Sequence, residues 1–188
     1  MANKVEFGIS NFYVGTYTVS GSTVTLGTPY HQAGAVSFSP SMDGSENNFW
    51  ADNIPYWSEF ADGPLSGDVV VAKFDEQFKK NFLGYKTSTA GGTALVKNAT
   101  KPKVYLMFQV EGDEEPLRCI MYNASLSGIT RAYNTITDTK TPDTEQITVT
   151  VNGDDGSGIM MDTFAYSTST ASTYYTMFTT PPSPGISS

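Results

Sequence analysis

The sequence predicts a mainly β fold, a β-sandwich or barrel-like domain with one short flanking α-helix at about residues 75–84. Three observations predict it. Short runs of β-branched and aromatic residues alternate with turns rich in Gly, Pro, Asn and Asp. A single stretch has the four-residue apolar period of a helix. Hydrophobic residues make up 39% of the 188 residues and charged residues 16%, which is enough apolar material for one folded core.

The first elements are predicted to be a hairpin and a separate strand. Residues 5–26 are small, β-branched or aromatic and are divided by the turn signal Ser20-Gly21-Ser22. Thr28-Pro29-Tyr30 interrupts this pairing because proline has no N–H for a ladder. A strand resumes over 33–39, where apolar and polar residues alternate, and Pro40 is expected to end it.

Residues 41–63 are expected to form a long extended loop. Pro55 and Gly63-Pro64 make long uninterrupted pairing doubtful, although short strands at each end could build an extended hairpin. The loop holds both Trp residues of the chain among several carboxylates, and such a mixture suits a contact with another subunit. The residues expected to make this contact are Met42, Asp43, Glu46, Phe49, Trp50, Asp52, Tyr56, Trp57 and Glu59.

A buried strand over 67–74 leads into the predicted helix. Asp75 is a good N-cap, and Gly84 fits the position that ends the helix. A helix this short is not stable alone in water, so its apolar stripe must pack on a sheet. The residues expected to form this packing core are Phe74, Phe78, Phe82 and Leu83.

The remaining chain predicts further strands and an arm. Residues 85–101 are expected to be a loop, and 103–110 with 117–126 a second hairpin around an acidic turn. Residues 128–142, with isolated Ile129, Tyr133 and Ile136, indicate an exposed loop or edge strand. Residues 146–151 and 159–166 flank the Gly-rich segment 152–158, which is expected to be a hairpin turn. We therefore expect one domain over 1–166 and a C-terminal arm or disordered tail over 167–188.

The charge balance and the single cysteine exclude several classes of function. There are 19 Asp and Glu against 11 Lys and Arg, so the chain lacks the basic surface that grips nucleic-acid phosphates. One cysteine allows no disulfide within the chain and too few thiols for a structural zinc site. The N-terminus has no apolar leader, and no apolar run approaches the roughly 20 residues that span a bilayer. We expect a protein that folds in a cytoplasm and has no membrane partner.

No constellation of residues predicts catalysis, a metal or another cofactor. His31 is the only histidine and lies in a turn region, and Cys119 lies in an apolar strand. A contact between these two side chains is possible in space. The acidic turn 111–115 lacks the ligand spacing of a calcium loop, and the turn interpretation accounts for the glycines of 152–158 without a metal. We therefore expect that the protein is not an enzyme.

Two interpretations of the exposed aromatic residues remain open. Trp50, Tyr56 and Trp57 are residue types that a carbohydrate-binding β-sandwich uses as a stacking platform. In the alternative interpretation they pack in a core or in an interface between subunits.

With these elements placed, the order of motifs resembles the major tail protein (tail tube) family of long-tailed, non-contractile bacteriophages. The resemblance runs from about Ala33 to Tyr166. It rests on the strand 33–39, on Phe49-Trp50-Ala51-Asp52-Asn53 with Pro55-Tyr56, on the strand and helix between Gly67 and Tyr85, and on the later strand pair. It departs from the family pattern where Tyr-Ala-Asp-Asp is expected and Trp50-Ala51-Asp52-Asn53 stands, and in the Ser/Thr-rich C-terminal arm.

The resemblance implies a tail tube fold and a structural role in the virion tail, with assembly in the cytoplasm of a bacterial host. Subunits would join as six-fold rings, and the rings would stack into a tube that conducts the genome into the host. Double-stranded DNA would pass through without specific binding, which agrees with the acidic balance. The implied partners are further copies of the chain, a tape measure protein, and terminator or tip proteins. The alternative function is a carbohydrate-binding module of a tail tip or cell surface.

Overall fold

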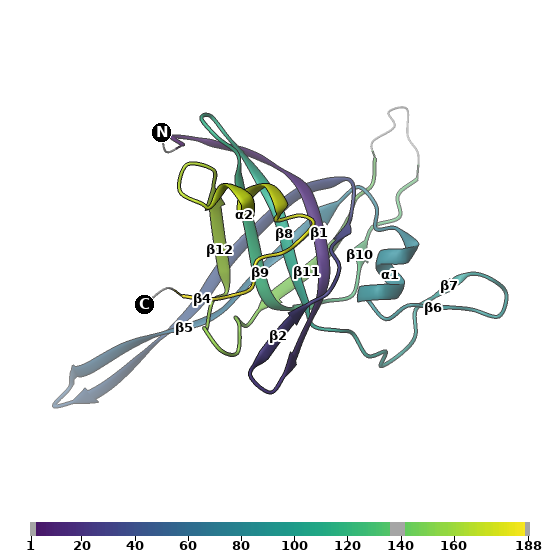
Figure 1. The fold of residues 1–188 in the computed structure, drawn as a ribbon. Helices are drawn as coiled ribbons and strands as arrows, with labels where there is room; N and C mark the ends of the chain where they lie inside the picture. The colour runs from purple at the N-terminus through teal and green to yellow at the C-terminus, as the bar shows by residue number, and fades with distance from the viewer. Residues whose placement is uncertain (1–2, 136–141, 187–188) are drawn as a thin grey trace.

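The computed structural model describes residues 3–135 and 142–186 and confirms the mainly β fold class (Figure 1). Twelve strands and two short helices occupy this part of the chain. The strands are β1 (Glu6–Ser20), β2 (Thr23–Leu26), β3 (Tyr30–His31), β4 (Ala35–Ala51), β5 (Ile54–Val71), β6 (Lys86–Thr87), β7 (Thr93–Ala94), β8 (Val104–Gly112), β9 (Leu117–Leu126), β10 (Thr130–Arg131), β11 (Glu145–Val151) and β12 (Met161–Ala165). The helices are α1 (Glu76–Phe82) and α2 (Ala171–Thr176).

One antiparallel sheet organises the molecule. Its strands follow the order β2-β1-β8-β9-β11-β5-β4, with β3 paired to β1, β10 to β11 and β12 to β9. Strand β9 has β8 along one side and is shared on the other side, where 124–126 pair with β11 and 117–121 pair with β12. The predicted hairpins β1–β2 and β8–β9 are both present. Strands β6 and β7 form a separate two-stranded ladder.

Both faces of the central strands are buried. Along β8, Leu106 and Phe108 belong to one hydrophobic cluster, whereas Tyr105 and Met107 belong to a second cluster. Successive side chains of a strand point to opposite faces, so the two clusters lie on the two sides of the sheet. The second cluster includes Met177 from the C-terminal segment. This segment therefore completes the core on that face.

Helix α1 covers part of the first cluster. The Asp75 carboxylate accepts a 2.7 Å hydrogen bond from the Phe78 N–H, and Gly84 follows the helix with a φ of +73°. Both are the cap residues that the sequence predicts. The four residues expected beneath the helix are all buried in the first cluster: Phe74, Phe78, Phe82 and Leu83.

Strands β4 and β5 are much longer than predicted, because Pro40 does not end β4. Strand β4 lies at the edge of the sheet, and an edge strand tolerates the missing N–H of a proline. Pro40 lies opposite Gly67, and pairing continues to Ala51 and Ile54 at the end of the hairpin with three register shifts. The turn is Asp52-Asn53, whose φ angles of 53° and 62° are those of a two-residue type I′ turn.

The segment 152–158 is not a hairpin turn, so that prediction is wrong. Strand β11 pairs with β5, β9 and β10, whereas β12 pairs with β9. Gly153 and Gly158 do adopt positive φ, as a turn requires. Strand β9 is ten residues long, however, so β11 and β12 can both pair along the same side of it, at different positions. This pairing with β9 prevails over the local turn signal.

The C-terminal segment contains a helix that the sequence analysis does not predict. Tyr174 of α2 is buried, and the Arg118 guanidinium lies 4.3 Å from the centre of its ring. The Tyr122 hydroxyl donates a 2.9 Å hydrogen bond to the Pro182 carbonyl. Parts of the segment between Tyr174 and Pro182 therefore lie against the sheet, and the division of the chain into a domain and an arm remains a prediction.

The expected loop over 128–142 contains the short strand β10, which pairs with β11. Its residues 136–141, which include Ile136, lie outside the described part of the chain.

Candidate functional site

The outer part of the β4–β5 hairpin projects from the body of the molecule. We call residues 42–64 the ribbon. In this part β4 is the one strand of the described residues that pairs with β5, because the pairing of β5 with β11 covers 65–71. Figure 1 shows the ribbon extending away from the sheet, on the side opposite α1 and the β6–β7 ladder. Every residue from Ser41 to Trp50 and from Asp52 to Asp62 is exposed.

Glycines allow the two strands of the ribbon to pair at its irregular positions. At Gly63, beside the register shift between Met42 and Gly44, a β-carbon would lie 2.2 Å from the Asp43 carbonyl oxygen. At Gly44 a β-carbon would lie 2.3 Å from the Phe60 ring, so this ring packs directly on the Gly44 backbone because no side chain is present there. The sequence therefore permits a bulged and paired ribbon rather than an irregular loop.

The ribbon exposes several large aromatic side chains. Trp50 is 62% exposed, Tyr56 73% and Trp57 51%. Phe49 and Trp57 lie opposite each other in the ladder and share one face, and a register shift separates this pair from Trp50, which lies opposite Pro55. Half or more of each of these side chains is left in contact with water within one protomer, and exposed clusters of this kind mark interaction surfaces.

All nine residues expected to make an inter-subunit contact lie in the ribbon and are exposed. Ile54 and Phe60, which are 57% and 67% exposed, also lie in the ribbon but were not predicted from the sequence. Phe60 lies between Glu59 and Asp62, the same mixture of aromatic and acidic residues, and this pattern could have identified it. The four residues expected to form the helix packing core lie in the first hydrophobic cluster and not in the ribbon.

The ribbon is uniformly acidic. It contains Asp43, Glu46, Asp52, Glu59 and Asp62 and no Lys, Arg or His. A surface that combines these carboxylates with aromatic rings fits a partner that is basic and apolar.

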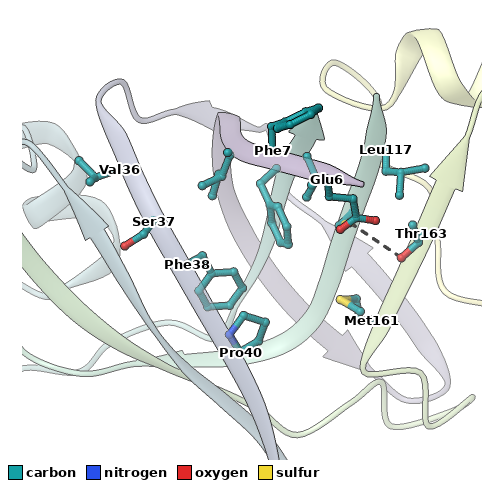
Figure 2. A pocket seen from close by; sticks show the side chains of 14 residues that line it. Glu6, Phe7, Val36, Ser37, Phe38, Pro40, Leu117, Met161 and Thr163 are labelled. Atoms are coloured by element: carbon teal, nitrogen blue, oxygen red, sulfur yellow. Dashed lines mark hydrogen bonds between the residues drawn. The ribbon is translucent and has the colours of Figure 1, made fainter. Parts of the chain in front are cut away.

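A second surface lies beside the base of the ribbon, where a groove of about 510 Å³ opens between β4 and β12 (Figure 2). Val36 and Phe38 line it from β4, Met161 from β12 and Phe7 from β1. Phe7, Val36 and Met161 are exposed at its rim. Among the described residues, neither β4 nor β12 has a paired strand on the side that faces the groove.

The residues weighed for catalysis do not form a site. His31 lies beside Tyr13, with ring centres 4.7 Å apart, whereas the Cys119 sulfur lies 3.8 Å from the Thr163 hydroxyl. Burial raises the pKa of Cys119 to about 11, so the thiolate is scarce at neutral pH. No hydrogen bond joins His31 and Cys119.

The acidic turn between β8 and β9 accepts hydrogen bonds from the N-terminal segment and from the segment that follows β12. Asp113 accepts a 2.9 Å hydrogen bond from the Lys4 N–H, and Glu115 accepts one of 3.0 Å from the Ser167 N–H. Within residues 3–135 and 142–186, no three His, Cys, Asp or Glu side chains gather in a way that could hold a metal ion. In the same residues, neither helix has the length and apolar character needed to cross a membrane.

In the segment 152–158, Asp154 is buried and accepts hydrogen bonds from the residues that surround it. Its carboxylate accepts hydrogen bonds from the Tyr17 hydroxyl at 2.7 Å and from the Ser157 N–H at 2.7 Å. Burial acts to raise the pKa of Asp154, but these and further hydrogen bonds outweigh it and the net pKa is lowered. The oxygens that a cation would need are thus already engaged.

Comparison with known proteins finds no matching family model and no matching curated protein. Three solved structures of tube components share a distant likeness. The sheath–tube complex of an extracellular contractile injection system (PVC) has a TM-score of 0.47 and 10% identity, over 82% of this chain and 88% of that chain. The tube-terminating cap of the anti-feeding prophage has a TM-score of 0.48 and 11% identity, over 88% and 96%. The PVC sheath/tube terminator has a TM-score of 0.42 and 11% identity, over 87% and 100%. At such identities and TM-scores, these likenesses assign the chain to no family.

Proposed function

We propose that this protein is a structural, self-assembling tail tube subunit, and that the ribbon joins one copy to another. In the full form of this proposal, six copies form a ring and the rings stack into a conduit for genome delivery. The ring number and the conduit come from the sequence resemblance to major tail proteins. Terminator, tip and tape measure proteins would then be further partners.

The observation that carries the proposal is the exposed aromatic ribbon. It is built from two long strands, and its rings have no core of their own chain to pack against. Burying Trp50, Tyr56 and Trp57 against another subunit would remove a large apolar area from water.

Two further features support assembly. The open outer edge of β4 presents unpaired backbone groups, which a neighbouring subunit can cover. The net charge of −8 would keep DNA from sticking to the wall of a tube, because carboxylates repel phosphates.

The first test replaces Trp50 and Trp57 with Ala and follows both assembly and folding. Rings or tubes of the wild-type protein should be visible by negative-stain electron microscopy and should sediment rapidly. The double variant should assemble poorly, while its free energy of unfolding changes by less than about 0.5 kcal/mol because both side chains are exposed.

Tyr175→Ala is the matched control, since Tyr175 is an exposed aromatic residue of α2, and it should assemble as the wild type does. A wild-type protein that stays monomeric at every concentration, or a double variant that assembles normally, would contradict the proposal.

The alternative, a carbohydrate-binding module, is favoured by the same exposure of Trp50 and Trp57. A glycan-array signal that disappears in the Trp double variant would support it.

A further inference from the structure

The chain separates its charge into an acidic end and a basic end. Residues 73–103 contain seven of the eleven Lys and Arg residues against only Asp75 and Glu76, a net charge of +5. The ribbon carries a net charge of −5. Figure 1 shows that α1 and the β6–β7 ladder, which belong to this basic stretch, lie on the far side of the body from the ribbon.

Three of these lysines are exposed and available to a partner. Lys79 forms an ion pair with Glu145, and Lys80 forms one with Glu76. Lys101 donates a 3.1 Å hydrogen bond to a carbonyl oxygen of β9, and Lys103 donates one of 2.6 Å to a serine hydroxyl of β9. Lys73, Lys86 and Lys97 are exposed and have no ion pair among the described residues.

The same region also exposes apolar side chains. Leu95 is 69% exposed and Val96 37%, and both directly precede Lys97 at the end of the β6–β7 ladder. We call Lys73, Lys86, Leu95, Val96 and Lys97 the lysine lobe. It combines positive charge with apolar surface, whereas the ribbon combines negative charge with aromatic surface.

We propose that the lysine lobe of one copy of this chain receives the ribbon of another copy. The inference rests on the proposed function, in which the ribbon joins copies, and adds the surface that the ribbon contacts. The two surfaces lie at opposite ends of one protomer, so they meet only between copies. The contact is head-to-tail, since each copy contributes a different surface to it.

The chemistry of the contact follows from the paired surfaces. Ammonium groups of Lys86 and Lys97 face carboxylates such as Glu46 and Glu59, and Leu95 with Val96 covers aromatic rings near the ribbon tip. Exposed ion pairs are individually weak, so several must act together with the apolar contact. Like charges brought together in the same place would oppose assembly strongly.

Charge reversal with mixing tests this contact directly. The ribbon variant carries Glu46→Lys and Glu59→Lys, and the lobe variant carries Lys86→Glu and Lys97→Glu. Each variant alone places like charges opposite each other at the exchanged positions and weakens the attraction between the two surfaces, so the concentration at which half of the protein sediments as assembly should rise at least about tenfold. An equal mixture of the two variants should assemble again, because each ribbon then meets a lobe of opposite charge.

The matched control carries Lys4→Glu and Lys103→Glu, two exposed lysines outside the lobe, and should assemble as the wild type does. Far-UV circular dichroism checks that every variant is folded. A lobe variant that assembles normally, or a mixture that does not recover, overturns the inference. If the lobe variant assembles normally while the Trp double variant does not assemble, the proposed function stands and the ribbon docks on another surface. The groove beside β4 is then the next surface to alter.

Discussion

At the scale of single residues, Glu145 is a buried carboxylate that joins three elements. It is 2% exposed, and its oxygens accept hydrogen bonds from the Phe74 N–H at 2.7 Å and from Arg131 at 3.1 Å. The Lys79 ammonium lies 3.3 Å away. Through these contacts β11 holds β10 and the start of α1 in place.

Replacing Glu145 with Ala should lower the free energy of unfolding by about 2–4 kcal/mol. The change leaves the buried Phe74 N–H without an acceptor and removes the partner of two cations. Urea denaturation followed by far-UV circular dichroism measures it, and the two Trp residues are unsuitable reporters because both lie on the exposed ribbon. Glu76→Ala breaks only an exposed pair with Lys80 and should change stability by less than about 0.5 kcal/mol. Equal effects of the two substitutions would refute this role.

Asp154 should make the stability of the protein depend on acidity. Its pKa is lower in the folded protein than the value of about 3.9 in an unfolded chain, so its contribution is present above pH 4. That contribution is lost as the pH falls through the lower folded pKa. Asp154→Asn should cost about 1–3 kcal/mol at pH 7 and less below pH 3, so the two stability profiles converge in acid. Parallel profiles would show that this carboxylate is not responsible.

At the scale of elements, the ribbon depends on Gly63. A β-carbon there would meet the Asp43 carbonyl oxygen, a backbone atom at the register shift between the paired residues Met42 and Gly44, so it cannot move without disturbing the pairing on either side. Gly63→Ala should therefore disrupt the ribbon and make it sensitive to limited proteolysis, while the unfolding of the body changes little. Gly8→Ala is the control, because no atom lies within 4 Å of the added carbon. A variant with a protease-resistant ribbon would contradict this role for Gly63.

The sequence predicts those elements whose signals are local. Strands β8 and β9 contain the apolar runs 104–108 and 119–122, and the residues that cap α1 and form its phenylalanine stripe can be recognised in the sequence. The extent of β4 could not be predicted, because Pro40 breaks an inner strand but not an edge strand, and the position of β4 depends on the whole sheet. The turn signal at 152–158 failed for a related reason, since β9 supplies a partner that the segment itself does not reveal.

For the candidate site, the aromatic and acidic residues of the ribbon were visible in the sequence, but its shape was not. Asp52-Asn53 has the residue types of a tight hairpin turn, and recognising it would have indicated the long pairing. The opposite placement of Lys97 and Glu59 could not be predicted, because it results from the path of the chain through the whole sheet.

At the scale of the whole molecule, the separation of charge gives the protein a direction. The ribbon extends from one side of the body, and the basic stretch lies on the other side (Figure 1). If copies join through these two surfaces, a growing polymer shows free ribbons at one terminus and free lysines at the other. Growth at the two termini would then differ in rate, and a capping protein that mimics only one of these surfaces would arrest elongation there while leaving the opposite terminus active.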